Sequence, residues 1–293
     1  MVSPGEILER FEKIRQAPLE GGVRAPHKPL FLLYLLGRLQ RTGSSKVTYT
    51  EIEPEVSRMI NDFGPAARDR HRAAMPFFYL DRSLWRLEGE PSRAAHSVLR
   101  DREARGELQV DVERALLADP RLLADVARRL LAANFPETYV EGICQAAGLD
   151  LAREAETAAP SAQRHSRSSE FREAVLGAYQ YACAMCGYDG ALGRDPVGVD
   201  AAHVHWHALG GPDDLSNGVA LCNLHHTLFD RGVLGLSDER CVVVSPSFVA
   251  RGDAGRTFVW ELDGKPLLGP KPSSRPIAST HIEWHRKQVF RAA

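Results

Sequence analysis

Residues 200–226 have the sequence DAAHVHWHALGGPDDLSNGVALCNLHH, and residues 183–186 have the sequence CAMC. These two stretches hold three of the five cysteines and five of the eleven histidines of the 293-residue chain. Thiolates and imidazoles so densely gathered are typical of a metal site. The spacing of the ligands therefore decides how this part of the chain folds.

Two short chelating pairs stand out, namely Cys183 with Cys186 and Cys222 with His225. Each pair closes a tight turn that can direct two ligands inward, which suits one tetrahedral Zn²⁺. Incidental core cysteines are the alternative, but two pairs at chelating spacing favour zinc. An odd number of cysteines argues against a disulfide framework. The sequence therefore predicts a structural zinc site.

The segment between the pairs resembles an HNH, or ββα-metal, nuclease. The resemblance implies that His203 is the general base, that Asn217 pins the loop and orients this base, and that His226 binds a catalytic divalent ion. Mg²⁺ or Mn²⁺ is the expected ion. The chemistry suits phosphodiester hydrolysis, because a neutral imidazole can accept a proton from water while a metal neutralises phosphate charge.

One position departs from the family pattern. Many HNH sequences place an Asp or a His immediately before the base, where this chain has Ala202. Asp200 would share the face of position 202 in an extended strand, so we expect Asp200 and His226 to bind the catalytic metal. A zinc-stabilised binding module without catalysis is the alternative for the whole segment.

The chain as a whole predicts an α+β fold with two domains. A mainly helical domain over residues 1–152 is followed by a linker over 153–169, which is rich in Ala, Ser and Arg, and by the zinc-containing ββα-metal domain over 170–293. Within the first domain, FFYLDRSLWRLE (77–88) alternates around a short turn and predicts a hairpin. Helix, strand, helix and hairpin is the order of a winged helix-turn-helix.

The net charge is −1, from 37 basic and 38 acidic residues, which excludes a protein that grips DNA by bulk charge. Residues 21–50 nevertheless hold five basic and no acidic residues, and residues 58–105 hold ten Arg against seven acids. These stretches predict local basic surfaces for phosphate contact. The longest apolar run, 29–36, is too short for a membrane span, and no signal peptide is evident, so we expect a cytoplasmic protein with no membrane partner.

Three segments of the first domain, APHKPLFLLYLL, MPFFYL followed by LWRLE, and NFPETYVEGICQAAGLD, together resemble a known module. It is the DNA sulfur-binding domain of McrA-type type IV restriction enzymes, which cut phosphorothioated DNA. The resemblance implies an apolar pocket for the sulfur atom, rimmed by basic groups and completed by an Arg from 93–105. The implied residues are Met75, Pro76, Phe77 and Tyr79 on the apolar side and His27 and Lys28 on the polar side.

The leading hypothesis is a modification-dependent restriction endonuclease that binds phosphorothioated double-stranded DNA. An HNH endonuclease directed to methylated or otherwise modified bases is the second hypothesis, and a non-catalytic zinc-containing DNA-binding regulator is the third. Cutting both strands requires two active sites or successive nicks, so we expect a homodimer or sequential nicking.

Overall fold

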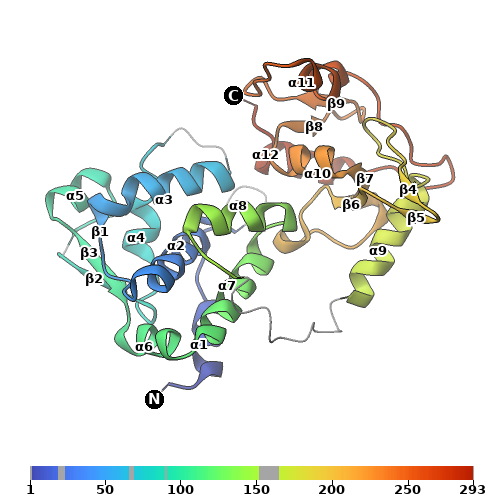
Figure 1. Cartoon of the computed structure of the whole chain (residues 1–293). Helices are drawn as coiled ribbons and strands as arrows, with labels where there is room; N and C mark the ends of the chain where they lie inside the picture. Colours follow the sequence, from blue (N-terminus) through green and yellow to red (C-terminus); the bar gives the residue numbers. More distant parts are fainter. Residues whose placement is uncertain (1, 19–23, 66–68, 90, 152–164, 293) are drawn as a thin grey trace. The chain divides into compact units, whose positions relative to one another are not determined.

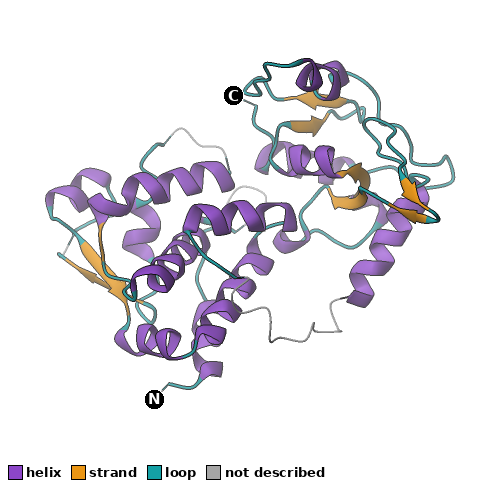
Figure 2. Ribbon diagram, viewed as in Figure 1, coloured by secondary structure: helices purple, strands orange, loops and turns teal. Residues whose placement is uncertain are grey.

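A computed structural model describes residues 2–18, 24–65, 69–89, 91–151 and 165–292 of the chain. The chain divides into two compact units, Met1–Ala159 and Pro160–Ala293. Figures 1 and 2 show a mostly helical first unit and a second unit that mixes helices with short strands, as expected for a mixed helix-and-strand chain. Of the predicted linker 153–169, residues 153–164 lie outside the described residues. Residues 165–169 belong to helix α9.

The first unit joins helices to one small antiparallel sheet with the strand order β1-β3-β2. Its elements in chain order are α1 (Pro4–Glu12), α2 (His27–Thr42), β1 (Val47–Thr48), α3 (Tyr49–Phe63), α4 (Ala74–Tyr79), β2 (Trp85–Glu88), α5 (His96–Asp101), β3 (Arg105–Leu108), α6 (Val110–Ala118), α7 (Pro120–Asn134) and α8 (Glu137–Ala147).

Helix α2 forms the centre of the first unit. Its apolar run is buried on most faces, as the continuous hydrophobic sequence predicts, and it ends at Gly43 in the left-handed conformation with φ 71°. A side chain at Gly37 would lie 2.1 Å from the carbonyl oxygen of Ala147. Glycine at this position therefore lets α2 and α8 approach closely, which compacts the helical core.

The predicted hairpin at 77–88 is wrong. Its first half belongs to α4, because Ala73, Phe77, Leu80 and Leu84 are buried at helical rather than alternating spacing. Its second half is β2, which pairs with β3 in the register Trp85↔Leu108 instead of pairing with residues 77–80. Helix α5 separates β2 from β3, so the winged-helix-like arrangement stays a prediction.

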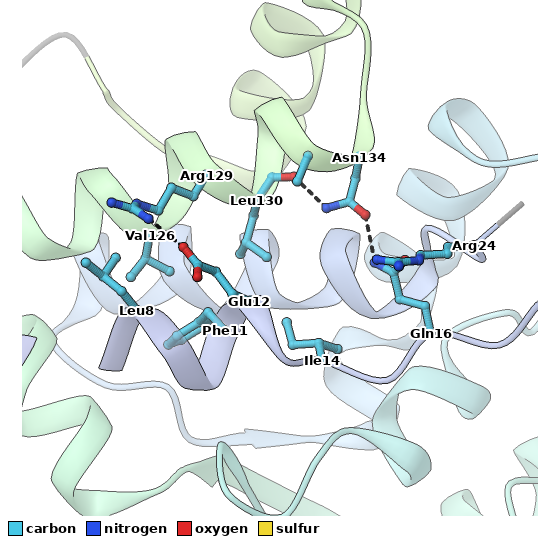
Figure 3. Close-up of a pocket in the computed structure, with 11 residues that line it drawn as sticks. Leu8, Phe11, Glu12, Ile14, Gln16, Arg24, Val126, Arg129, Leu130 and Asn134 are labelled. Atoms are coloured by element: carbon cyan, nitrogen blue, oxygen red, sulfur yellow. Dashed lines mark hydrogen bonds and ion pairs between the residues drawn. The ribbon is translucent and has the colours of Figure 1, made fainter. Parts of the chain in front are cut away.

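Helix α1 packs against α7 across a small hollow of about 70 Å³ (Figure 3). Ser3 caps α1 by accepting a hydrogen bond from the backbone N–H of Glu6. The hollow is lined by apolar side chains and closed by polar contacts between the two segments, Arg129 to Glu12 and Gln16 to Asn134. This cavity is large enough for only a very small molecule, and its polar contacts serve to hold α1 in place.

The second unit is built around a β-hairpin-like pair followed directly by a helix. Strands β6 and β7 are antiparallel with the register Val199↔Cys222 to His203↔Gly218, and α9 packs on both. The unit's elements are α9 (His165–Ala178), β4 (Ala191–Leu192), β5 (Asp195–Pro196), β6 (Val199–His203), η2 (His207–Leu209), η3 (Leu215–Asn217), β7 (Gly218–Cys222), α10 (Asn223–Asp230), β8 (Leu234–Leu236), β9 (Val242–Val244), α11 (Asp253–Phe258), η4 (Trp260–Leu262) and α12 (Ser279–Gln288).

Because β6 pairs with β7 and α10 follows β7 directly, residues from both ends of the segment 199–230 lie close together. Val175 and Phe171 of α9 pack so closely on Gly218 that a side chain there would meet the Val175 methyl at 2.2 Å. None of the described helices is long and apolar enough to cross a membrane.

Candidate functional site

The four sequence-predicted zinc ligands converge in the second unit. The Nδ1 atom of His225 lies 3.2 Å from the Cys222 sulfur and 3.4 Å from the Cys183 sulfur, and the Cys186 and Cys222 sulfurs are 4.0 Å apart. A tetrahedral Zn²⁺ with ordinary bond lengths requires about 3.6 Å between sulfur and nitrogen and about 3.8 Å between sulfurs. The cluster therefore has the size and the donor set that zinc needs.

The cluster also has the electrostatics of a metal site. The hydrogen bond shared with Cys222 holds the pKa of the Cys183 thiol well below its usual range and raises that of Cys222, so one sulfur takes the thiolate form that binds metal. The Nε2 atom of His225 lies 2.9 Å from the Phe258 carbonyl oxygen. Donation to this carbonyl leaves the Nδ1 lone pair directed at the sulfurs, which is how proteins commonly orient a histidine ligand.

His203 occupies the last position of β6, opposite Gly218 of β7. Its ring stacks on Phe171 at a centroid distance of 4.0 Å, and its Nε2 atom lies 2.8 Å from a carboxylate oxygen of Asp213. These two contacts hold the ring from its face and from its edge. An imidazole that donates Nε2–H to a carboxylate keeps Nδ1 free to accept a proton.

The surroundings of His203 favour its neutral form. Burial lowers its pKa most, the hydrogen bond to Asp213 opposes that shift, and the nearby His207 and His226 lower the pKa further. The net shift is downward, so the ring is a neutral base at neutral pH. His207 of η2 and His226 of α10 thus lie near enough to His203 of β6 to lower its pKa.

Asn217 is fully buried and binds the loop between β6 and β7. Its Oδ1 accepts the backbone N–H of His205 at 2.7 Å, and its Nδ2 donates to the carbonyl oxygens of His205 and Pro212, both at 2.9 Å. A side chain at Gly211 would overlap the His205 carbonyl, so this loop folds tightly over the amide. The three bonds fix the loop that carries Asp213.

The two expected catalytic metal ligands are in different environments. Asp200 accepts a hydrogen bond from Arg172 at 2.7 Å and, by strand alternation, lies on the opposite face of β6 from His203. His226 lies 3.3 Å from the buried carboxylate of Asp230, one turn further along α10. Asp213 is thus the carboxylate that is hydrogen-bonded to His203, and the role of Asp200 as a ligand of the catalytic metal stays a prediction.

In the first unit, the residues expected to contact sulfur divide into two groups. Met75 and Tyr79 lie one turn apart on α4 with 51% and 54% of their surface exposed. Pro76 is buried, and Phe77 is fully buried against Tyr49 and Trp85. Phe77 is a core residue in this structure, because its ring has no surface left for DNA, and this corrects its expected place in the pocket.

The expected polar side also has internal partners. Arg72 donates a hydrogen bond to His27 Nε2 at 2.9 Å, and burial, together with the Arg72 charge, lowers the pKa of His27 to about 4. His27 is therefore a neutral ring with its proton on Nδ1. Lys28 forms an ion pair with Asp81 at 3.0 Å, so part of its charge is already compensated.

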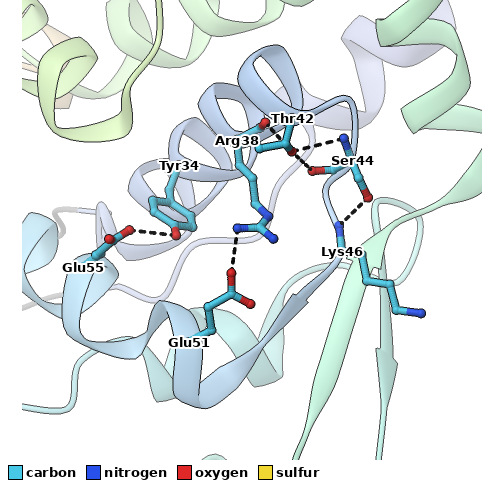
Figure 4. Close-up of polar contacts among 7 residues, drawn as sticks. All are labelled: Tyr34, Arg38, Thr42, Ser44, Lys46, Glu51 and Glu55. Carbon is cyan, nitrogen blue, oxygen red and sulfur yellow. Dashed lines mark hydrogen bonds and ion pairs between the residues drawn. The ribbon is translucent and has the colours of Figure 1, made fainter.

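The stretch 21–50 contains no acidic residue, but the fold brings an acidic residue from outside the stretch next to it. Arg38 pairs with Glu51 at 2.8 Å (Figure 4). Arg41 donates to the carbonyl oxygens of Ala147 and Gly148 at the end of α8. Lys46, by contrast, is exposed, and Figure 4 shows its ammonium directed away from the other labelled groups. Acids from outside the stretch thus reduce the basic surface that its composition predicts.

Comparison with known families now bears on both units. A family model described as ScoMcrA-like, DNA sulfur-binding domain matches residues 4–152, which is half of the chain. The chain belongs to this DNA sulfur-binding family. A second model, HNH endonuclease, matches residues 183–237 and covers the zinc-ligand cluster, His203, Asn217 and His226. The chain therefore combines a DNA sulfur-binding domain with an HNH endonuclease domain, as the sequence predicts.

Solved structures show likenesses of low TM-score. The sulfur-binding domain of ScoMcrA complexed with phosphorothioated DNA is 22% identical, with a TM-score of 0.42, and the match covers 48% of this chain and 94% of that one. The corresponding SprMcrA domain is 22% identical, with a TM-score of 0.43 and coverages of 50% and 95%. A modification-dependent TagI restriction endonuclease is 26% identical, with a TM-score of 0.29 and coverages of 48% and 41%. No curated protein sequence matches this chain.

Two residues of these domains escaped the sequence prediction. Asp213 of the HNH domain lies in the turn after Gly210-Gly211, and an acid between base and Asn217 was the signal that could have found it. Arg72 of the sulfur-binding domain is hydrogen-bonded to His27, which lies 45 positions before it in the chain. No local sequence pattern predicts that contact.

Proposed function

We propose that this chain is a restriction endonuclease that binds phosphorothioated double-stranded DNA and hydrolyses nearby phosphodiester bonds. One observation carries the proposal, namely the presence in one chain of a DNA sulfur-binding domain and an HNH endonuclease domain. The solved relatives bound to phosphorothioated DNA bear the first of these domains.

In the proposed reaction His203 takes a proton from the attacking water at Nδ1. Asp213 holds the opposite edge of the ring, fixes the tautomer and stabilises the imidazolium that forms. Phe171 limits rotation of the ring by stacking on its face. Asn217 keeps the Asp213 loop in register with β6, so the base is positioned before DNA arrives.

We propose that a divalent ion binds beside His203, with Asp200 and His226 as the ligands that the sequence predicts. His226 would hold it, oriented by the buried Asp230, with His207 and Asp213 as further donors. Imidazole and carboxylate donors suit Mn²⁺, Mg²⁺ or a similar ion. When bound, such an ion supplies charge neutralisation at the scissile phosphate. Cys183, Cys186, Cys222 and His225 would hold the structural Zn²⁺.

For the sulfur-binding domain we propose that Met75 and Tyr79 present the apolar surface to the modified linkage. A non-bridging sulfur is larger and less strongly hydrated than oxygen, so it loses little on leaving water for an apolar face. An ordinary phosphate oxygen would lose hydration there without replacement, which gives discrimination. We propose that His27, Lys28 and Pro76 complete the site, as the family resemblance implies.

The deciding experiment is a cleavage assay on matched normal, methylated and phosphorothioated duplexes, with and without Mg²⁺ or Mn²⁺. We expect cleavage only of the phosphorothioated duplex and only with the ion. Equal cleavage of the methylated duplex would favour a base-modification reader, and binding without cleavage would favour a regulator. Counting nicks and double-strand breaks over time distinguishes a homodimer from sequential nicking. Cytoplasmic DNA is the expected substrate.

A further inference from the structure

A second group of metal-ligating side chains lies in the sulfur-binding domain, apart from the residues proposed to contact DNA. Glu53 comes from α3, His71 from the segment before α4, and His96 from the start of α5. One ligand atom from each of the three lies within 4.8 Å of the other two. Two imidazoles and one carboxylate form a donor set that zinc accepts in proteins.

The carboxylate of Glu53 is the unusual member. The residue is only 8% exposed, and it accepts hydrogen bonds from the Ser57 hydroxyl at 2.9 Å and from His71 Nδ1 at 2.8 Å. The hydroxyl is neutral, and the imidazole is charged only if it is protonated. A buried carboxylate needs a positive charge nearby, and a divalent cation held jointly with histidines would supply it.

The two histidine rings are already brought together. Their centroids are 3.7 Å apart and their planes are 19° from parallel. Protonation of both rings would set two positive charges face to face, whereas each neutral ring keeps one lone pair that can bind a cation. His96 is also fixed at Nδ1, which lies 3.1 Å from the Tyr49 hydroxyl.

The surrounding contacts place the donors without filling the site. Ser57 accepts the backbone N–H of Ala73 at 3.0 Å, and Asp69 accepts the backbone N–H of His71 at 2.9 Å. These bonds fix the chain segment that carries His71, whose side chain is 49% exposed. Nearly parallel rings cannot both direct a lone pair at one ion, so binding requires one ring to turn. His71 has the exposure that permits this rotation.

We propose that Glu53, His71 and His96 bind a divalent cation of the zinc class, separate from both metal sites of the HNH domain. The ion would link α3, the segment before α4 and α5, which lie far apart in the sequence. Its fourth position would remain open to water or to an exogenous ligand. The proposal is independent of the endonuclease function.

The test uses full-length protein, equilibrated with buffered Zn²⁺, desalted and measured for zinc per chain. We expect His71→Gln, His96→Gln and Glu53→Gln each to retain one zinc ion fewer than the wild type. His281→Gln, which changes a histidine of α12, is the matched control and should retain the wild-type amount. Cys222→Ser removes a ligand of the HNH cluster and should reduce zinc independently of the other three.

A second readout guards against misfolding. Zinc added to metal-stripped protein should raise the melting temperature of the sulfur-binding domain in the wild type and in His281→Gln but not in His71→Gln. Because His71 is half-exposed, its replacement should leave the fold intact, as circular dichroism can verify. Equal zinc content and an equal melting shift in the wild type and in the His71 and His96 variants would overturn the proposal.

Discussion

The HNH centre and the sulfur-binding face differ in how closely the structure follows the sequence prediction. In the HNH domain, the three cysteines and the one histidine chosen by spacing converge, with His225 within hydrogen-bonding distance of two sulfurs. In the sulfur-binding domain, residues chosen together separate into an exposed pair, Met75 and Tyr79, and a buried pair, Pro76 and Phe77. Metal ligands are distinctive residue types, whereas apolar contact residues are the same types that build a core.

The largest effect that we expect comes from breaking the zinc cluster. Cys222→Ser should lose zinc and unfold the HNH domain, because structural zinc contributes on the order of 10 kcal/mol to folding in small zinc domains. Binding to phosphorothioated DNA should persist, since the two units have separate cores. Zinc analysis, thermal melting and gel shift measure these outcomes. Cys241→Ser, a free cysteine outside the cluster, is the control, and full zinc retention by Cys222→Ser would contradict the cluster.

Removing the general base should reduce the cleavage rate strongly but should leave the folding of the HNH domain unchanged. His203→Ala should reduce single-turnover cleavage by about 10²–10⁴-fold, the usual contribution of general base catalysis. DNA binding should change by less than about threefold, because affinity comes from the other domain. His281→Ala serves as the control, and nicking at the wild-type rate by His203→Ala would remove the histidine from the mechanism.

Replacing the carboxylate beside the base should have a smaller and pH-dependent effect. Asp213→Asn should lower the cleavage rate about 10- to 100-fold, because an amide no longer stabilises the imidazolium. Asp213 raises the pKa of His203 against the effect of burial, so its removal should lower that pKa and move the acidic limb of the pH–rate profile to lower pH.

The neighbouring Asp214→Asn is a matched control for Asp213→Asn. Asp214 accepts hydrogen bonds from the backbone and the hydroxyl of Ser216, and an asparagine can still accept them. We expect a near-normal rate and an unmoved acidic limb. Identical pH profiles for Asp213→Asn and the wild type would mean that Asp213 does not act through His203.

The exposed face of α4 should contribute a moderate amount of binding energy. Met75→Ser combined with Tyr79→Ser should reduce the preference for phosphorothioated over normal DNA about tenfold, as partial loss of apolar contact predicts. Val110→Ser combined with Leu117→Ser alters similarly exposed apolar residues of α6 and should leave the preference unchanged. Competition gel shifts measure the ratio, and an equal loss in both double variants would count against the α4 face.

The smallest effect should come from the basic stretch. Arg38→Ala should change DNA affinity by less than about twofold and stability by about 0.2–1 kcal/mol, since Arg38 forms a surface ion pair with Glu51. Binding measured at two salt concentrations provides the test. A tenfold loss of affinity with a smaller salt slope would show that Arg38 contacts phosphate despite its partner.

Several features follow from the sequence because they depend on local chemistry. The Ser3 cap of α1, the end of α2 at Gly43 and the Asp119 cap of α7 are each formed by residues within a few positions of the helix end. The chelating pairs Cys183/Cys186 and Cys222/His225 belong to the same class, because each pair lies within one turn. The two pairs lie far apart in the sequence, but each could be recognised by itself from its own spacing.

Tertiary structure decided the features in which several partners compete for the same residue. Residues 77–79 belong to α4 rather than to a strand, because Phe77 packs on Tyr49, which lies far outside the local sequence window. The positive charge of Arg38 is compensated by an ion pair with Glu51, which belongs to another helix.

The same limit applies at the candidate centres. Residue type and spacing alone determined the zinc ligands as candidates, because few other roles suit those residues at those intervals, whereas the resemblance to HNH nucleases implied His203, Asn217 and His226. Only the folded chain pairs Asp200 with Arg172, brings Asp213 to His203 and gathers Glu53, His71 and His96. Carboxylates are common on any surface, so their partners depend on which segments the core brings together.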